Sequence, residues 1–502
     1  MADARTARQN GPPLSLWIGG ALGIAVSVHA VFIAWYGPYT APGYIRAGVM
    51  MACAVIMVLW KPLALEIGRG GVTRALAWML DLAMLANFAY ASLLFLRQVS
   101  NVNLLILSYS PAEIATATGA ILTLIELTRR AFGPILALVG AVVLAYALWG
   151  GGLPGFFSHS GFDLETLVGP IWYGFQGVFG FATSTIISVV FIYIVFGAML
   201  EGSGAGELMI RVALWATGRS RGGAGHAAIL ASSVFGMSSG SVVANVVGTG
   251  TVTIPLIKRR GFSPAFAGAL EAAASSGGQI MPPVLGAAAF LMAQLVGLSY
   301  QSIVIASTLP ALLFYFALFV SVEKEARRLG IEPLADAERP RLQPGDGLRS
   351  LMFVAPIAAI LVTLALGRST AMAGFWAVIT TLVTALILNP ALRQQPGKLL
   401  VALARGGYAG AQVMVAVGSI GILVGVFDLT GLGLRFAMAV SSLQTSGLLV
   451  PLLLSAAACL VLGMGMSTLP AYLIETLLRG RAICPGNASP PPGGADRNFI
   501  FI

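Results

Sequence analysis

Two short, polar, glycine-rich segments interrupt long apolar stretches near the middle of the chain. The first, 236–241, reads Gly-Met-Ser-Ser-Gly-Ser, and the second, 275–283, reads Ser-Ser-Gly-Gly-Gln-Ile-Met-Pro-Pro. Glycine and proline disfavour a continuous helix, so the backbone should unwind at both places. Unwound carbonyls and hydroxyls supply the oxygen ligands that hard cations prefer, and free N–H groups at half-helix N-termini can hold a carboxylate. The predicted chemistry is binding of a cation, of a carboxylate-bearing solute, or of both.

Each of these features also has a purely structural explanation. Small residues such as those at 238–241 line closely packed membrane helices. A second interrupted segment nearby nevertheless favours a binding site over packing. His226 is either a proton relay or an interfacial residue beside flanking arginines, and we favour the second interpretation. Glu271 lies half a helix from the second interruption, where it either takes part in coupling, faces a cavity or pairs with a donor on the preceding segment.

The composition is that of a multi-pass membrane protein. The chain of 502 residues is 57% hydrophobic and 10% charged, with a mean hydropathy of +0.88, which leaves too little polar surface for a soluble protein of this size. The net charge of +10 fits the basic bias of cytoplasmic loops better than nucleic-acid binding. No nucleotide-binding Gly-Lys-Ser/Thr loop, Ser/His/Asp set or His-rich metal motif occurs in the sequence. We therefore predict a protein that is not an enzyme and has no cofactor.

The first polar segment lies within 222–257, a stretch of 36 residues without Asp, Glu, Lys or Arg. Because about 20 helical residues cross the hydrocarbon core of a membrane, this stretch is too long for one crossing. Its polar middle is unsuited to two crossings, and basic residues at 219, 221 and 258–260 place both ends on the cytoplasmic side. We predict a re-entrant hairpin, whose unwound tip is tolerated at membrane depth only in a cavity or binding site.

The second polar segment divides 262–298, in which Glu271 is the one formal charge. Two successive prolines cannot donate backbone hydrogen bonds and disfavour helix before them. This stretch should therefore be a helix broken halfway, at about the depth of the hairpin tip. Two broken elements that meet at the membrane midplane predict the binding site of a transporter.

The other apolar stretches predict nine membrane helices around these two elements. The segment 111–128 is either a short tilted crossing, which the order of charged loops favours, or an interfacial helix, and 162–180 should lie at the outer surface. Asp81 and Asn87 should each make an interhelical hydrogen bond. The nine predicted helices are 14–36, 44–60, 75–96, 132–149, 181–200, 309–322, 351–366, 371–388 and 406–427.

Residues 448–478 repeat features of the first hairpin. The run Leu-Val-Leu-Gly-Met-Gly-Met-Ser at 460–467 matches Ser-Val-Phe-Gly-Met-Ser-Ser-Gly at 233–240, and the order of spans lets the second hairpin enter from the opposite face. The predicted fold class is an all-α polytopic membrane protein, an inverted-repeat transporter with re-entrant hairpins and broken helices. No second broken helix follows, because the composition turns Pro-, Gly- and Asn-rich after 478. We expect a truncated or out-of-frame end, with a natural disordered tail as the alternative.

Three motifs together resemble a known transporter family. They are Gly236-Met-Ser-Ser-Gly-Ser-Val-Val-Ala-Asn245, Ile254-Pro-Leu-Ile-Lys258 and Glu271-Ala-Ala-Ala-Ser-Ser-Gly-Gly-Gln-Ile-Met-Pro-Pro283. They resemble the fused permease subunit of tripartite ATP-independent periplasmic (TRAP) transporters, above all the TAXI type, and the resemblance covers nearly the whole chain. It implies a small-subunit-like membrane domain at 1–150, a linker at 151–161, an incomplete large-subunit-like transport and scaffold domain at 162–478, and an atypical polar tail at 479–502.

The resemblance implies an elevator-type secondary transporter of the bacterial inner membrane. Such a symporter takes up a small organic solute, expected to be anionic, that a periplasmic TAXI-type substrate-binding protein delivers. A cation gradient drives uptake, with sodium as the expected coupling ion and the proton as the alternative.

The family's two ion sites are carried over residue by residue. The first would use side-chain or backbone oxygens of Ser239, Ser241, Asn245, Gly278, Met281 and Pro282. The second is partial, because its broken-helix partner is absent from the sequence and Leu469-Pro470 departs from the usual order near the tip. Its remaining ligands would be Gly463, Gly465, Ser467 and Thr468.

Two functions of other classes remain open at this point. Re-entrant elements also build ion channels, which would conduct without a binding protein and without saturation by a solute. A permease that lacks half of a site could also be an inactive membrane scaffold that binds a partner protein and moves nothing.

Overall fold

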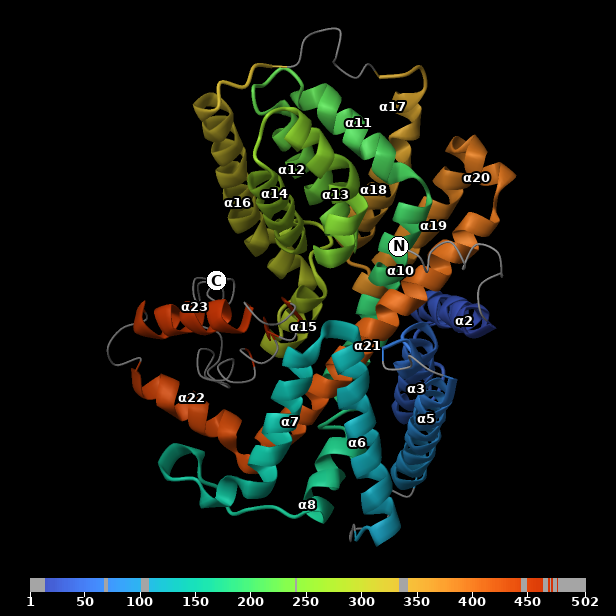
Figure 1. Ribbon diagram of the computed structural model, residues 1–502, viewed down its shortest axis with the longest axis vertical. Helices are drawn as coiled ribbons and strands as arrows, with labels where there is room; N and C mark the ends of the chain where they lie inside the picture. Colours follow the sequence, from blue (N-terminus) through green and yellow to red (C-terminus); the bar gives the residue numbers. More distant parts are fainter. Residues whose placement is uncertain are drawn as a thin grey trace.

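The structure, a computed structural model, consists of helices and connecting loops throughout its described residues (Figure 1). Nine helices in this part of the chain are long and apolar enough to cross a membrane, and each coincides with one of the nine predicted spans. The prediction of an all-α polytopic membrane protein is therefore confirmed. The structure describes residues 14–66, 71–100, 108–239, 242–333, 342–443, 449–463, 468–469, 471–472 and 476.

The N-terminal helices form a lower body, which we define as α2 to α8 (Figure 1). The long helix α21 (Gly397–Thr430) runs diagonally across the molecule and packs against α2, α3, α6 and α7. One hydrophobic core therefore includes side chains from both predicted domains, among them Met50, Leu124 and Val417. The helices of the lower body are α2 (Leu14–Tyr36), α3 (Pro42–Trp60), α4 (Leu63–Glu66), α5 (Gly71–Ser100), α6 (Pro111–Phe132), α7 (Pro134–Trp149) and α8 (Leu164–Val168).

Helix α6 contains the whole of the segment 111–128, for which the sequence left two interpretations. It is one continuous helix of 22 residues, with a capping box in which the Ser110 hydroxyl accepts from the Glu113 backbone N–H and the Glu113 carboxylate accepts from the Ser110 backbone N–H. Such reciprocal caps fix the first turn of a helix. It packs against α5, α7 and α21, and it is not one of the nine candidate membrane spans among the described residues. After α7, two short 3-10 turns, Gly150–Gly152 and Gly155–Phe157, lie at the start of the predicted linker and within it.

A buried ion-pair cluster ties α5 and α6 together in the lower body. The Arg130 guanidinium donates to the Asp81 carboxylate over 2.7 Å, and both side chains are almost fully buried. The same guanidinium donates to Glu126, and the Leu63 backbone N–H donates to the second oxygen of Asp81. Asn87 donates to the Thr116 carbonyl. The predicted interhelical bonds of Asp81 and Asn87 are confirmed, and that of Asp81 is a salt bridge.

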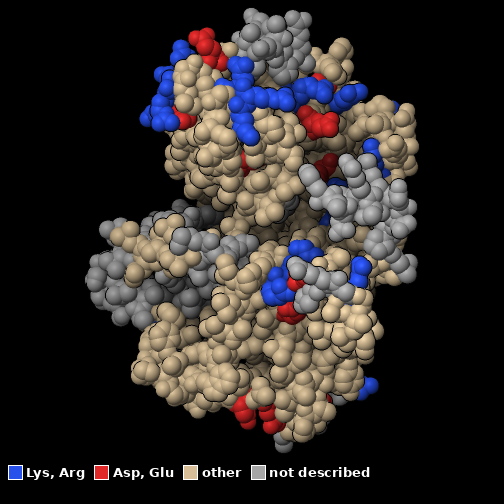
Figure 2. Space-filling view, in the orientation of Figure 1, with Lys and Arg blue, Asp and Glu red and all other residues tan. Residues whose placement is uncertain are grey.

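The predicted hairpin and broken helix lie in an upper body, which we define as α11 to α16 (Figure 1). Figure 2 shows basic residues gathered at its far end, where the sequence places the turn between α11 and α12 and the end of α13. The helices are α11 (Ala205–Thr217), α12 (Gly223–Ser239), α13 (Val242–Arg259), α14 (Pro264–Gly277), the 3-10 turn η5 (Gly278–Ile280), α15 (Ala287–Val296) and α16 (Tyr300–Arg328).

Helix α16 corrects one boundary predicted from the sequence. The prediction ended the membrane helix at 322 and began a charged loop at 323, whereas the helix continues to Arg328. Two ion pairs within the last turns, Arg327 to Glu323 and Arg328 to Glu325, have the spacing that supports a helix. The charged residues there extend the helix beyond its apolar part instead of ending it.

The other helices connect the two bodies or follow α21. Of the predicted second hairpin, α23 covers most of the first arm, and the tip at 464–467 lies outside the described residues. These helices are α9 (Phe181–Thr185), α10 (Phe191–Gly202), α17 (Asp346–Arg349), α18 (Leu351–Ala365), α19 (Thr370–Leu388), α20 (Pro390–Gln394), α22 (Leu432–Leu443) and α23 (Leu449–Gly463).

Candidate functional site

The first hairpin arm and the broken helix meet backbone to backbone at two glycines. A methyl group on Gly278 would lie 2.6 Å from the Cα of Gly236, and one on Gly236 would lie 2.8 Å from the Cα of Gly278. Carbon atoms that are not bonded prefer separations of about 3.5–4.0 Å, so any larger residue would push the two elements apart. The glycines predicted to mark the hairpin and the break therefore bring these two elements into direct contact.

Asn245, from the second hairpin arm, lies fully buried beside this contact. Its amide Nδ2 donates to the Ser232 carbonyl of α12 over 2.8 Å, and a methyl group on Gly236 would lie 2.5 Å from the same nitrogen. From the described residues, the amide oxygen Oδ1 accepts one long bond of 3.3 Å, which the Thr249 hydroxyl donates. With its nitrogen engaged by the hairpin, Asn245 presents an oxygen with spare acceptor capacity at the meeting point.

The break itself contains backbone carbonyls in a non-helical conformation. Those of Gly278 and Met281 accept from the backbone N–H groups of Met281 and Leu285, both over 3.4 Å. Gly278 begins the 3-10 turn η5, and Met281, which follows it, has extended dihedral angles. Among the described residues, no backbone N–H outside the helices donates to the Pro282 carbonyl. The three predicted ligands Gly278, Met281 and Pro282 thus lie together in the break, and the carbonyl of Pro282 is available to a ligand.

Two tyrosines of α16 hold the backbone on either side of the break. Tyr315 donates its hydroxyl to the Ala274 carbonyl over 3.0 Å, before the break. Tyr300 donates to the carbonyls of Pro283 and Val284, after it. Buried carbonyls without partners are costly, so the tyrosines satisfy the carbonyls that flank the break. Sequence reasoning missed both residues, because neither belongs to a polar motif.

Ser275 is a functional candidate that the predicted ligand set did not include. Its side chain is fully buried, and its hydroxyl has no hydrogen-bond partner among the described residues. A methyl group on Gly236 would lie 3.5 Å from the Ser275 carbonyl, which places this residue at the contact between hairpin and break. A buried hydroxyl without a partner in a native structure calls for an explanation, and a bound ion or water is a common one. The Ser-Ser-Gly-Gly run at 275–278 is the feature of the sequence that could have drawn attention to this position.

Glu271 pairs with donors on the hairpin, one of the outcomes that the sequence left open. Its carboxylate is fully buried and accepts hydrogen bonds from the hydroxyls of Ser232, Thr249 and Thr253 over 2.7, 2.5 and 2.5 Å. Ser232 belongs to the first arm and both threonines to the second. One carboxylate of α14 therefore bonds to both arms of the hairpin, next to Asn245.

The remaining predicted ligands lie partly beyond the described structure. Ser239 is the last residue of α12, and its side chain is outside the described residues, as is the whole of Ser241. In the second predicted site, Gly463 ends α23 and Thr468 lies in a short helical piece, whereas Gly465 and Ser467 are not described. The second site therefore stays a prediction from the resemblance.

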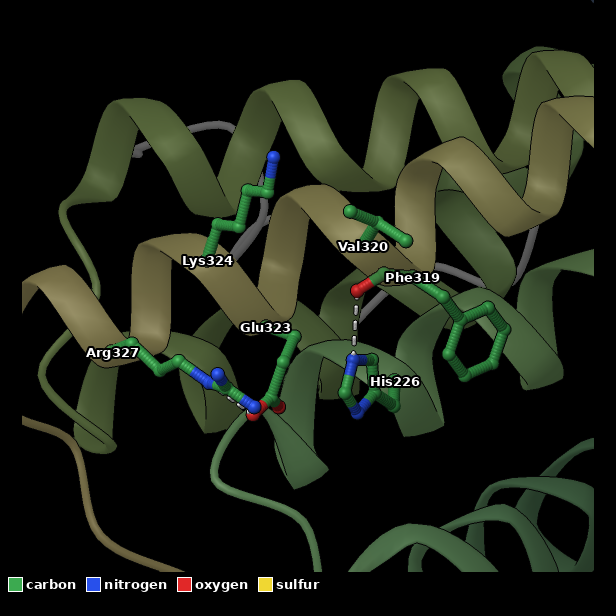
Figure 3. Close-up of a pocket in the computed structure, with 6 residues that line it drawn as sticks. All are labelled: His226, Phe319, Val320, Glu323, Lys324 and Arg327. Atoms are coloured by element: carbon green, nitrogen blue, oxygen red, sulfur yellow. Dashed lines mark hydrogen bonds and ion pairs between the residues drawn. The ribbon is translucent and has the colours of Figure 1, made fainter.

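His226 has a structural role at the far end of the hairpin. Figure 3 shows it beside a cavity of about 380 Å³, with its Nε2 atom directed at the Phe319 carbonyl, 3.1 Å away. Because a carbonyl only accepts, Nε2 must carry the proton, and Nδ1 can accept from the Ser220 hydroxyl at 2.7 Å. The ring also stacks on Phe319. Both ring nitrogens are thus engaged, Nε2 with α16 and Nδ1 with Ser220 in the turn before α12.

The chain matches a known protein family and is similar to several curated proteins. The family model described as "Tripartite ATP-independent periplasmic transporter, DctM component" matches residues 119–479. The chain is similar to the uncharacterized protein YgiK of Salmonella typhimurium, with 30% identity over 29% of this chain and 33% of the relative. It is 27% identical to the sialic acid TRAP transporter permease protein SiaT of Haemophilus influenzae, over 33% of this chain and 26% of the relative.

A third relative is the C4-dicarboxylate TRAP transporter large permease protein DctM of Vibrio cholerae. It is 25% identical over 39% of this chain and 39% of its own length. The aligned stretches thus cover between about a quarter and two fifths of these curated relatives.

Proposed function

Because the chain belongs to the DctM component family of tripartite ATP-independent periplasmic transporters, we propose that it is the permease of a secondary active uptake system in the bacterial inner membrane. It takes up a small organic anion, uses a cation gradient, and receives the solute from a periplasmic substrate-binding protein of the TAXI type. The resemblance of the three sequence motifs supports the TAXI type, sodium as the coupling ion and an elevator-type movement.

The contact between hairpin and break carries the proposal of a cation site. Oxygen atoms of Asn245, Ser275 and Pro282 lie in the elements that meet there, and each has unused acceptor capacity. A hard cation takes several such neutral oxygens, and unwound backbone at the junction of broken helices is where transporters bind their coupling ions. The residues present therefore fit a sodium ion better than a catalytic or soft-metal site.

The relatives' names support an anionic solute. They refer to C4-dicarboxylates and to sialic acid, which both carry carboxylates. Half-helix N-termini, such as those of α13 and α15 at the two interruptions, favour negative groups through their free N–H donors. Succinate and sialic acid are accordingly the first solutes to test.

The decisive experiment measures sodium binding to the purified full chain without any solute. A ligand at one hundred times its dissociation constant stabilises the native state by about 2.7 kcal/mol, so sodium should raise the melting temperature relative to choline. Asn245→Ala should remove this increase. Asn87→Ala is the matched control, because it removes an interhelical amide bond in the lower body and should leave the sodium response intact.

Uptake into proteoliposomes then tests transport. With the binding protein added, uptake of the active solute should saturate and should require the sodium gradient, and Asn245→Ala should abolish it. Flux without binding protein and without saturation would establish a channel instead, and sodium binding with no uptake of any solute would establish an inactive scaffold. Unchanged uptake in Asn245→Ala would refute the assignment of the site.

A further inference from the structure

We propose that the cavity beside His226 binds an anionic phospholipid of the cytoplasmic leaflet. The phosphate of the lipid lies at Lys324, and one acyl chain follows the exposed apolar face of α16. The cavity is at the far end of the upper body, away from the contact between hairpin and break. The proposal rests on the membrane location of the chain and is independent of the coupling ion and of the solute.

The cavity has apolar walls and a charged edge. Its volume is about 380 Å³, and its apolar walls are the side chains of Phe319 and Val320 together with the ring of His226, which stacks on Phe319. Both ring nitrogens of His226 already have partners, so the ring offers a flat surface to a ligand. Apolar walls with a few charged groups at the edge are typical of a ligand pocket.

The cavity lies where α16 leaves the hydrocarbon core of the membrane. Residues 300–322 of this helix carry no charge, and Glu323 is its first charged residue. These residues span about 34 Å of helix, slightly more than the hydrocarbon thickness of about 30 Å. The basic residues at 219, 221 and 258–260 place this end of the upper body on the cytoplasmic side. Lys324 therefore lies at the depth of the phosphate groups in the cytoplasmic leaflet.

Lys324 supplies a positive charge to which the described residues give no ion-pair partner. The Arg327 guanidinium donates to the Glu323 carboxylate over 3.0 Å, whereas the ion pairs of the described part of α16 do not include Lys324. Figure 3 shows the Lys324 ammonium directed away from Glu323, on the same side of α16 as Val320. Two cations and one carboxylate line the cavity, which leaves one positive charge. A phosphodiester carries one negative charge, and lysine is a common phosphate ligand.

An apolar face of α16 leads from Lys324 toward the middle of the membrane. Four apolar residues precede Lys324 at intervals of three or four positions, namely Leu309, Leu313, Phe316 and Val320. This spacing places them on one side of the helix, and the first three are exposed. A phospholipid with its phosphate at Lys324 would cover this face with an acyl chain, which a free phosphate ion cannot do.

Native mass spectrometry of the purified full chain in detergent tests the proposal, with phosphatidylglycerol as the lipid. The chain should retain this lipid in preference to phosphatidylcholine, whose headgroup has no net charge. Lys324→Gln should weaken the binding of phosphatidylglycerol about fivefold, the effect of one basic residue beside an anionic lipid. Arg328→Gln is the matched control, because it removes the same charge from the same helix but does not line the cavity. It should bind the lipid like the native chain.

A second pair of variants tests the cavity without any change of charge. Val320→Trp fills the cavity and should reduce the retention of phosphatidylglycerol to that of phosphatidylcholine. Ala317→Trp is its control, because Ala317 is exposed on the same helix and does not line the cavity. Its retention of phosphatidylglycerol should equal that of the native chain. The melting temperature of each variant shows that it is folded.

Three results would overturn the proposal. The first is equal retention of the two lipids by the native chain. The second is an equal effect of each substitution and its control, which would show that the lipid responds to this end of the molecule in general. The third is competition by glycerol phosphate, which lacks acyl chains and would identify the ligand as a free anion. Sodium and solute are absent from these measurements, so their outcome does not depend on the proposed transport.

Discussion

Two buried carboxylates of this protein differ in what surrounds them. Asp81, in the lower body, accepts from the Arg130 guanidinium and from the Leu63 backbone N–H. Glu271, in the upper body, accepts from three hydroxyls. A guanidinium and a backbone N–H can only donate, whereas a hydroxyl can donate or accept. The partners of Asp81 can therefore only donate to its side chain, whereas the partners of Glu271 can donate to its side chain or accept from it.

This difference matches the roles of the two bodies. The Asp81 cluster joins helices that pack around α21 and belong to the common core, where a fixed arrangement is sufficient. The Glu271 network lies between the hairpin and the broken helix, the elements that carry the candidate site. Fixed charge pairs therefore accompany the scaffold, and adaptable hydroxyls accompany the binding site.

Breaking the charge pair in the lower body should have the largest effect. Arg130→Met leaves Asp81 buried opposite a single backbone donor, and removing one partner of a buried ion pair costs about 3–5 kcal/mol. We expect a large fall in melting temperature, measured by scanning fluorimetry in detergent. Adding Asp81→Leu should recover much of this loss, because the uncompensated charge is then gone. A double variant as unstable as the single one would contradict the explanation.

Separating the hairpin from the break should have an intermediate effect, confined to the upper body. Gly278→Ala places a methyl group 2.6 Å from the Cα of Gly236, and overpacking of this kind costs about 1–3 kcal/mol. We expect a moderate loss of stability together with loss of the sodium response. Gly268→Ala, in α14, meets no atom within 4 Å and is the control, for which both properties should be retained.

Equivalent neutral substitutions at the two carboxylates should have unequal effects. In Asp81→Asn, the new amide NH₂ group must face a guanidinium or a backbone N–H, neither of which can accept, and an unsatisfied buried group of this kind costs about 1–3 kcal/mol. In Glu271→Gln the hydroxyls can reverse, so the cost should stay near the value of about 1 kcal/mol for one hydrogen bond. The melting temperatures of the two variants at neutral pH test this expectation. Equal losses of stability would show that the hydroxyls around Glu271 accommodate an amide no better than the donors around Asp81 do.

Local chemistry made the hairpin and the broken helix predictable. The two prolines at 282–283 stand where the helix is broken, and the length of an uncharged stretch limits how it crosses a membrane. The unwinding predicted for 236–239 and 275–277 was wrong, because α12 continues to Ser239 and α14 to Gly277. The contact between Gly236 and Gly278 follows from two interruptions at the same depth. These features need no knowledge of distant partners.

The partners of the buried groups could not be predicted in the same way. Arg130 lies 49 residues from Asp81, and Tyr315 lies 41 residues from the carbonyl that it binds. No periodic pattern links such positions, because they depend on which helices become neighbours. The solitary hydroxyl of Ser275 is likewise visible only when its surroundings are known.

The two tyrosines of α16 also have a mechanical consequence. Tyr300 and Tyr315 attach to the chain on opposite sides of the break and are separated by fifteen residues, which is about 22 Å along a helix. Two hydrogen bonds so far apart hold both sides of the broken segment against the same helix. A shift of α16 along the break would have to disrupt at least one of them.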